Sequence, residues 1–417
     1  MRSRIWILLS VAMASPALAQ IGPIGQQLPG VAQPVERALG GTLESIDRTL
    51  GTGVDATTRT VRSAAALAQA RIDRLGDLVR RNPAAIERDA DGNPARKGEL
   101  LLVAPDQATL DAARQLGFSI LAEERLDMLD LSVTRLSVPR GMTLAQAQAR
   151  LRKAAPEATV AADTLNFPSG STAPARGRED KASSLQLPPV ATPVGVIDGA
   201  PGPAIPVEAV RGFAPGAPAP GDHGSAVVSL LRRAGVQRVL VADVYGSGPA
   251  GGNALAIAQG IDWLMGRGVR VISISLVGPA NGLLARTMGA AQRRGAVIVA
   301  AVGNDGPAAP PAYPASYPSV LAVTGVDGRN RALIEAGRAL HLDYAAPGAD
   351  MRAMNAAGRL VPVRGTSFAT PLVAARAANA MDARAALPAT LDREAIDLGA
   401  RGPDAVFGRG LICTICR

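Results

Sequence analysis

The sequence predicts an α/β protein whose main domain is a doubly wound, mostly parallel sheet, preceded by a small α+β domain of the ferredoxin-like type. From residue 190 onward, apolar strands alternate with helices. Strands such as residues 269–274 are rich in Val and Ile, which suits a parallel sheet covered by helices on both faces. Upstream, residues 98–165 show the order strand, helix, strand, strand, helix, strand, which is the split βαβ arrangement.

The composition indicates a globular protein with more than one folding unit. A chain of 417 residues exceeds one ordinary core, and 47% hydrophobic with 19% charged residues is typical of folded domains. The net charge is +9, but nearly all basic residues are arginines scattered among acids, and aromatic residues for base stacking make up only 3%. We therefore expect no nucleic-acid partner.

The N-terminus has the pattern of an export signal. Residues 1–4 give a positively charged start through Arg2 and Arg4, residues 5–14 form an apolar stretch, and Ala17-Leu18-Ala19 offers a small-x-small cleavage site. Residues 1–19 are therefore predicted to be a signal peptide removed before Gln20, since an uncleaved anchor would need a longer apolar span. The mature chain is expected to be secreted or periplasmic, with no stable membrane span.

The rest of the chain divides by composition. Residues 20–97 are polar and Ala-rich, with helical patterning over 40–81 and a turn-rich break at 89–94, and suggest a helical or partly disordered segment without chemistry. The remaining divisions are the small domain at 98–165, a Ser-, Pro- and Gly-rich linker at 166–189, the main domain at 190–400 and a C-terminal tail at 401–417. In the small domain we expect strands at 99–104, 118–122, 129–138 and 158–162, and helices at 107–116 and 143–154.

The only two cysteines, Cys413 and Cys416, stand in Cys-Thr-Ile-Cys near the end of the chain. Export makes a small disulfide loop plausible, and free thiols are the alternative. A metal site would need further soft ligands, and His223 and His341 are the only histidines. We therefore expect no metal site at these cysteines.

Four polar residues stand where chemistry is favoured. Asp198 ends the strand 193–197 and Asn304 follows the strand 296–302, at the carboxyl ends where ligands gather in open α/β sheets. His223 precedes a helix, and Ser367 lies where a Gly turn opens an Ala-rich helix. Taken singly, Asp198, Asn304 and Ser367 each have a structural alternative as a turn or helix-cap residue, and His223 has one as a structural or merely exposed histidine.

Together the four residues define a family resemblance. The chain order Asp, His, Ser is that of the subtilisin solution to the catalytic triad. Residues 365–371, Gly-Thr-Ser-Phe-Ala-Thr-Pro, match the nucleophile motif of the subtilases in full. His223-Gly224-Ser225 and residues 301–304 are similar to the family's His-Gly-Thr and Ala-Ala-Gly-Asn, and residues 275–279 and 344–348 look like its substrate-binding strand and Ala-Pro-Gly segment. The resemblance spans roughly residues 190–380.

This resemblance implies a secreted serine endopeptidase that is made as a proenzyme and acts on polypeptides. Asp198, His223 and Ser367 would be catalytic, and Asn304 would bind the oxyanion. Residues 98–165 would be a propeptide that folds and inhibits the enzyme. Family members often bind structural calcium, although acids cluster poorly here, and no other cofactor is implied. The implied substrate-binding residues are Ser275, Leu276, Val277, Gly278, Ala301, Val302 and Gly303.

Departures from the family pattern suggest a second hypothesis. The family's Asp-Ser/Thr-Gly is here Asp198-Gly199-Ala200, which loses a hydroxyl from the acid loop. A degenerate binding or scaffold protein with little peptidase activity is therefore the alternative function. Val277 also stands where the family usually has Gly, so large aromatic residues before the cleaved bond should be disfavoured.

Residues 246–251 match G-x-G-x-x-G between a strand and a helix. A dinucleotide site would need an acid at the end of the next strand, where Ile274, Ser275 and Leu276 stand. Pro249 also lacks a backbone N–H for a phosphate. The motif is interpreted as a tight loop.

Overall fold

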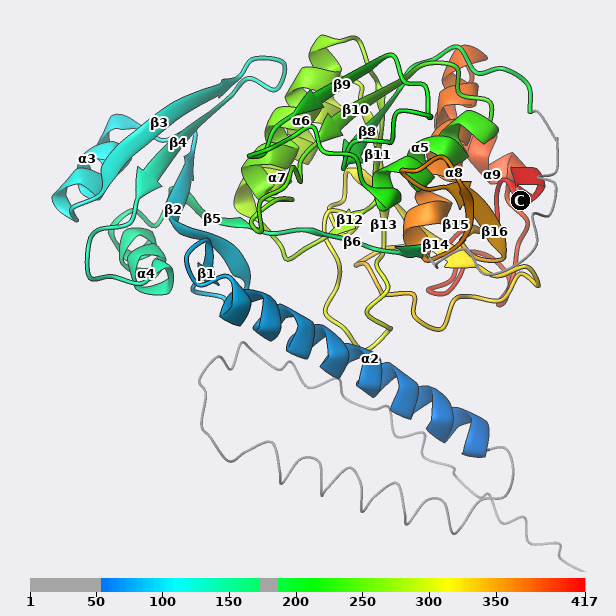
Figure 1. Ribbon diagram of the computed structural model, residues 1–417, viewed down its shortest axis with the longest axis horizontal. Coiled ribbons are helices and arrows are strands. Elements are labelled where there is room, and N and C mark those ends of the chain that lie inside the picture. The colour runs from blue at the N-terminus through cyan, green and yellow to red at the C-terminus, as the bar shows by residue number, and fades with distance from the viewer. Residues whose placement is uncertain (1–53, 173–186, 417) are drawn as a thin grey trace, which may run out of the picture. The chain divides into compact units, whose positions relative to one another are not determined.

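The computed structural model describes residues 54–172 and 187–416 (Figure 1). The predicted signal peptide at 1–19 lies outside these residues. A long helix, α2 (Val54–Arg81), lies within the range 40–81 where helical patterning is predicted. Residues 40–53 of that range lie outside the described residues. Within the described ranges, no helix combines the length and hydropathy required to cross a membrane.

The small domain has the predicted order of elements and an antiparallel sheet in which β5 pairs with β2, β2 with β4, and β4 with β3. A short additional strand, β1, also pairs with β2, so this sheet begins before the predicted boundary at residue 98. Both helices have a capped start, at Asp106 and at the Thr143–Gln146 capping box. The bounds are β1 Ile86–Arg88, β2 Pro94–Val103, α3 Gln107–Gln115, β3 Ser119–Leu126, β4 Leu131–Ser137, α4 Leu144–Ala154 and β5 Thr159–Thr164.

The sheet of the small domain is apolar on both faces. Alternate residues of a strand point to opposite faces, and in β2 Leu100 and Leu102 join a core with Phe118 and Leu151, beneath the domain's own helices. Leu101 and Val103 instead join the core that includes residues of helices α6 and α7 in the main domain. The two faces of β2 therefore belong to two different cores, and the second face packs the small domain against the main domain.

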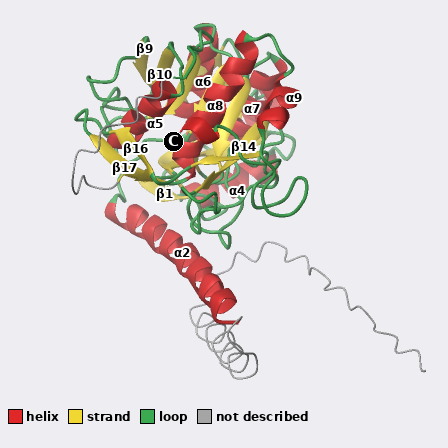
Figure 2. Cartoon of the chain, turned by 90° about the vertical axis from the view of Figure 1, so that its right-hand side faces the viewer, coloured by secondary structure: helices red, strands yellow, loops and turns green. Residues whose placement is uncertain are grey.

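The main domain is built on a seven-stranded sheet of order β15-β14-β13-β11-β8-β10-β9, and all its strand pairs are parallel. Helices cover both of its faces, as the sequence predicted (Figures 1 and 2). The strands are β8 Val194–Asp198, β9 Ala209–Gly212, β10 Val239–Asp243, β11 Val271–Ile274, β13 Val297–Ala301, β14 Val320–Val326 and β15 Tyr344–Pro347. The helices are α5 Asp222–Arg233, α6 Ala254–Gly266, α7 Gly282–Arg293, α8 Thr366–Asp382 and α9 Leu387–Glu394.

The strand order reverses between β8 and β11. From β8 the chain builds β9 and β10 on one side, and then β11, β13, β14 and β15 on the other. The carboxyl ends of β8 and β11 flank this switch point, which is where open α/β sheets place their ligands. Asp198 ends β8, and Ser275 directly follows β11.

The structure differs from the sequence-based expectation at the start of the predicted linker. Two short strands, β6 (Phe167–Pro168) and β7 (Ser171–Thr172), pair antiparallel with β12 (Leu276–Val277) and β17 (Leu360–Arg364). Strand β17 also pairs with β16 (Met351–Met354). The composition of residues 166–172 is that of a linker and gives no sign of strands. The segment forms strands because the unpaired backbone groups at the edges of β12 and β17 can hydrogen-bond with an extended chain beside them. The later part of the predicted linker, residues 173–186, lies outside the described residues.

The predicted tail is packed against the main domain. Cys413 and Cys416 form a disulfide with their Cα atoms 5.3 Å apart. Cys413 directly precedes a short 3₁₀ turn, η1 (Thr414–Cys416), and Cys416 ends it. Both cysteines are buried in the core that includes α5 and α8, and the N–H of Cys413 donates to Glu394 Oε1 at 2.9 Å. The disulfide was one of the two alternatives that the sequence left open.

Gly195 gives a test of packing at the centre of the sheet. A Cβ at this position would lie 2.7 Å from Leu264 Cδ1 and 3.1 Å from Val269 Cγ1. We expect Gly195→Ala to lower stability by about 1–3 kcal/mol, because extra volume in a filled core forces strain. Thermal unfolding of the chain carrying Ser367→Ala measures this. Leu264→Ala and the double variant complete a double-mutant cycle, in which the double variant should lose less stability than the sum of the two single losses. An unchanged Tm for Gly195→Ala would contradict the packing argument.

Candidate active site

Asp198 and His223 form a buried hydrogen-bonded pair. The Nδ1 atom of His223, in the first turn of α5, lies 2.8 Å from Asp198 Oδ2 and 3.0 Å from Oδ1. The N–H of Gly199 donates to Asp198 Oδ1 at 2.7 Å. Helix α5 approaches closely because residue 224 is Gly, where a Cβ would lie only 2.1 Å from the Gly199 carbonyl oxygen. The carboxylate is therefore placed to fix the orientation of the imidazole.

The acid loop is ordered without the hydroxyl that the family usually has at position 199. The Ser225 hydroxyl accepts from the Gly202 N–H at 2.9 Å and donates to the Gly221 carbonyl at 2.7 Å. The N–H of Gly221 in turn donates to the Ala200 carbonyl at 2.9 Å. These bonds join the acid loop to the start of α5, so the Gly199-Ala200 departure leaves the Asp198–His223 contact in place.

Ser367 and Asn304 meet at the start of α8. Gly365 precedes this helix with a φ of 139°, a conformation suited to glycine, and Ser367 is fully buried. The N–H of Thr366 donates to Asn304 Oδ1 at 3.0 Å, which fixes the side-chain amide. The N–H of Gly303 donates to Thr366 Oγ1 at 3.1 Å. These contacts hold the Asn304 Nδ2 group and the Ser367 N–H toward the same point.

The carbonyl oxygen of Ser169 occupies that point. The Ser367 N–H donates to it at 3.1 Å, and Asn304 Nδ2 donates to the same oxygen. The N–H of Ser169 donates to the Ser275 carbonyl, also at 3.1 Å. Strand β6 runs directly into this residue, so the chain lies in the site as an extended segment.

The Ser367 hydroxyl is bonded to this segment and to Ser275. Its Oγ atom lies 2.7 Å from Ser169 Oγ and 3.1 Å from the Ser275 carbonyl oxygen. His223 Nε2 is buried and has no hydrogen-bond partner among the residues that the structure describes. The imidazole nitrogen that could accept a proton is thus present, while the hydroxyl is engaged elsewhere.

Most of the predicted substrate-binding residues contact the extended segment that lies in the site, residues 166–170. Leu276 and Val277 pair with Pro168 and Phe167. Gly278 lies so close to Asn166 that a Cβ would be 2.2 Å from Asn166 Oδ1. A cavity of about 680 Å³ beside Ser169 is lined by Val277, Gly278, Val302, Gly303 and Asn304, among others, whereas the predicted Ala301 is buried in β13 and does not line it.

Helix α2 also reaches this cavity, which the sequence did not indicate. Arg71 Nε and Arg74 Nη2 lie 3.2 Å and 2.7 Å from the carboxylate oxygens of Asp305, the residue after Asn304. Arg71, Arg74 and Leu75 line the cavity. In the sequence these arginines resemble any exposed helical arginine, and only their contact with Asp305 distinguishes them.

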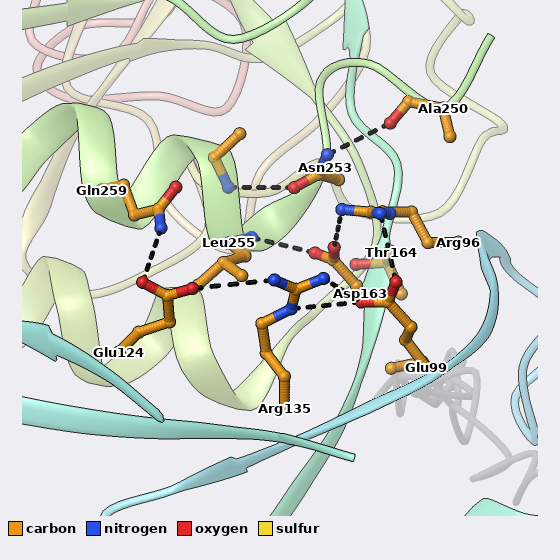
Figure 3. A network of polar contacts seen from close by, with 12 residues as sticks. Arg96, Glu99, Glu124, Arg135, Asp163, Thr164, Ala250, Asn253, Leu255 and Gln259 are labelled. Atoms are coloured by element: carbon orange, nitrogen blue, oxygen red, sulfur yellow. Dashed lines mark hydrogen bonds and ion pairs between the residues drawn. The ribbon is translucent and has the colours of Figure 1, made fainter. Parts of the chain in front are cut away.

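A polar network joins the small domain to the start of α6 (Figure 3). Asp163, at the end of β5, is fully buried and accepts from the Leu255 N–H at 2.9 Å. Its Oδ2 atom has no hydrogen-bond partner in the described part of the chain, and Arg96 Nη1 lies 3.9 Å away. Glu99 and Arg135, 2.8 Å apart, complete the charged cluster. Burial raises the pKa of the Asp163 carboxyl from about 3.8 to about 6.

Across residues 54–172 and 187–416, no three or more His, Cys, Asp or Glu side chains are grouped as a metal site. The calcium site that the family resemblance allows therefore has no candidate among these side chains.

Comparison with known proteins identifies the family. The family model described as "Subtilase family" matches residues 219–410, a range that contains His223, Asn304 and Ser367. Subtilisin DY of Bacillus licheniformis is 32% identical over 198 residues, which cover 46% of this chain and 70% of that protein. Subtilisin Savinase of Lederbergia lenta is 34% identical over 179 residues, or 40% of this chain and 66% of its own length. The chain belongs to the subtilase family of serine peptidases.

Two further similarities show how much of its relatives this chain covers and which fold it shares with a solved structure. Minor extracellular protease Epr of Bacillus subtilis is 29% identical over 196 residues, and the match covers only 30% of that relative's length. Among solved structures, fervidolysin of Fervidobacterium pennivorans, a keratinolytic enzyme related to subtilisin, has a TM-score of 0.62 at 17% identity over 77% of this chain and 61% of its own. This structural similarity shows the subtilisin-like fold.

Val277 gives a test of the cavity beside Ser169. Its Cγ1 atom lies 3.3 Å from where a Cβ of Gly303 would be, so the branched side chain narrows the cavity between β12 and the Gly303 backbone. In a peptide library, Val277→Gly should raise kcat/KM for Phe or Tyr before the cleaved bond about ten- to hundredfold relative to Ala. Val210→Ala, in the edge strand β9 outside the cavity, is the control. If Val277→Gly and the parent chain have the same ratio of kcat/KM for Phe or Tyr over Ala, Val277 does not narrow the cavity.

Asp163 gives a test of pH dependence. Its pKa is higher in the folded protein than the value near 3.8 of an exposed carboxyl, so the folded state binds the proton more tightly. Stability from this group is present below pH 4 and is lost as the pH rises from about 4 to about 6. In urea unfolding of the Ser367→Ala chain, Asp163→Asn should remove this fall while keeping the bond from Leu255. Identical pH profiles for the two proteins would exclude the assignment.

Proposed function

We propose that this chain is a secreted or periplasmic serine endopeptidase made as a proenzyme, in which residues 98–165 are an inhibitory propeptide domain. The observation that carries the proposal is the position of the Ser169 carbonyl. Its oxygen accepts hydrogen bonds from Ser367 N–H and Asn304 Nδ2, directly beside the Ser367 hydroxyl. Two preorganised donors on one carbonyl, next to a nucleophile, are the requirement for stabilising a tetrahedral intermediate of acyl transfer.

The proposed mechanism follows from these groups. A serine hydroxyl is a weak nucleophile until a base removes its proton, and His223 Nε2 is the available base. Asp198, bonded to Nδ1, keeps the imidazole in the productive tautomer and stabilises its charged form. Ser367 attacks the substrate carbonyl, His223 protonates the leaving amine, and water hydrolyses the acyl-enzyme. Asn304 and the Ser367 N–H carry the oxyanion in both steps.

The proenzyme state is supported by the same contacts. The segment after β5 fills the site from Asn166 to Gly170, and Ser169 Oγ bonds the Ser367 hydroxyl. Buried apolar packing between the small domain and α6 and α7 holds that segment in place. The predicted signal peptide at 1–19 supports export, in keeping with relatives such as an extracellular protease of Bacillus subtilis. The intact Asp198–His223 pair favours this reading over a scaffold without activity.

Removal of the nucleophile tests the proposal. We expect the exported chain to hydrolyse casein and to react with a fluorophosphonate at Ser367, while Ser367→Ala does neither. In subtilisin, loss of the triad serine lowers turnover about 10⁶-fold. Ser247→Ala, in the exposed loop after β10, is the matched control and should keep full activity. Equal casein hydrolysis by the parent chain and by Ser367→Ala would refute a serine peptidase.

A further inference from the structure

The structure holds a specific peptide bond in the candidate active site, and its surroundings restrict the residue that can follow. We propose that Ser169–Gly170 is the bond that the proenzyme cuts to release itself, and that Phe368 limits the position after the cleaved bond to glycine. This inference rests on the proposed peptidase function. It names the bond and the class of substrate, which that function alone leaves open.

The backbone pairing on both sides sets the register of this bond. Before it, Phe167 and Pro168 pair with Val277 and Leu276, and the Ser169 N–H donates to the Ser275 carbonyl. After it, Ser171 and Thr172 pair with Arg364 and Val363 of β17. The chain is thus held as a strand on each side of one peptide unit. Both oxyanion donors, Ser367 N–H and Asn304 Nδ2, point to the Ser169 carbonyl oxygen.

Gly170 fits because it has no side chain. A Cβ at residue 170 would lie 2.7 Å from Phe368 Cε2, 3.1 Å from Phe368 Cζ and 3.1 Å from Ser367 Cβ. Real Cβ atoms do not approach a carbon to 2.7 Å, so any other residue would require the Phe368 ring to move. The backbone of Gly170 needs no special dihedral angle, so the restriction is one of space alone.

The Phe368 ring is not free to move aside. Its side chain is fully buried in the core that contains α5 and α8. Its ring centroid lies 5.5 Å from that of His223, so the same ring packs against the proposed base. The Gly365 backbone is also close, because a Cβ at Gly365 would lie 2.8 Å from the Cα of Gly170. The Phe368 ring and the Gly365 backbone therefore both restrict the space around the residue after the bond.

The proposed cleavage is a hydrolysis that needs water as its only co-reactant. Ser367 Oγ forms a bond to the Ser169 carbonyl carbon and passes its proton to His223 Nε2. The Ser169–Gly170 C–N bond then breaks, and the Gly170 nitrogen leaves with that proton as a free amine. Water attacks the Ser169 ester, passes a proton through His223 back to Ser367 Oγ, and leaves the Ser169 carboxylate. The substrates implied for other chains are extended polypeptides with glycine after the cleaved bond.

Self-cleavage of the full-length chain is the first test. N-terminal sequencing of the large product should begin at Gly170. Gly170→Ala should slow its appearance about ten- to hundredfold, because the added methyl group meets a filled core. Gly170→Ala/Phe368→Met should recover most of the rate, since the flexible Met side chain can vacate the ring's position. Gly248→Ala, whose Cβ would meet nothing within 4 Å, is the control and should cleave at the parent rate.

Cleavage of synthetic peptides tests the glycine restriction even if the Gly170→Ala chain does not fold. The processed parent enzyme should cut an extended peptide with Ser–Gly at its centre about ten- to hundredfold faster than the same peptide with Ser–Ala. Fluorophosphonate labelling of Ser367 is measured on the same sample. Labelling with equal rates for the two peptides overturns the glycine restriction, and a large product that begins elsewhere overturns the assignment of the Ser169–Gly170 bond. Either result leaves the peptidase function standing. Absence of both labelling and hydrolysis overturns the two together.

Discussion

The hydrogen bonds from Ser367 N–H and Asn304 Nδ2 to one carbonyl oxygen are the interaction on which the site depends. Both donors are fixed at the start of α8: the Gly365 turn sets the Ser367 N–H, and the bond from Thr366 N–H to Asn304 Oδ1 sets the side-chain amide of Asn304. A peptide in this position cannot shift without losing both donors. The position of the Ser169 carbonyl therefore sets the register of β6 and β7. It also limits where β5, the last strand of the small domain, can lie.

The parallel sheet brings these parts together. Asp198 lies at the end of β8, Ser275 follows β11 and Asn304 follows β13, so three neighbouring strands deliver side chains or carbonyls to one edge. Helices α5 and α8 then supply His223 and Ser367 from their first turns. The central strands are fully buried, so their ends have little freedom, and the distances between these groups are set by the backbone ladder.

The sequence predicted the fold class well because its signals are local: Val- and Ile-rich strands, capped helices and glycine turns. It also placed Asp198, His223, Asn304 and Ser367 at strand ends and helix starts, where the structure finds them in two hydrogen-bonded groups. It did not predict the roles proposed for Ser169 and Gly170, or the contact of Arg71 with Asp305. Their positions depend on contacts with residues far away in the chain, and a Ser-Gly pair in a polar stretch has the composition of a linker.

The pairing of β6 and β7 on either side of Ser169 also bears on how a substrate protein must present itself. Residues 167–172 lie along two edges as extended chain, and six extended residues span about 20 Å, whereas six helical residues rise only about 9 Å. A target held in the same way would have to give up any helix or internal strand pairing over that length. Resistance of a folded protein would then be governed by the free energy of local unfolding of one short segment, rather than by how many suitable bonds its sequence contains.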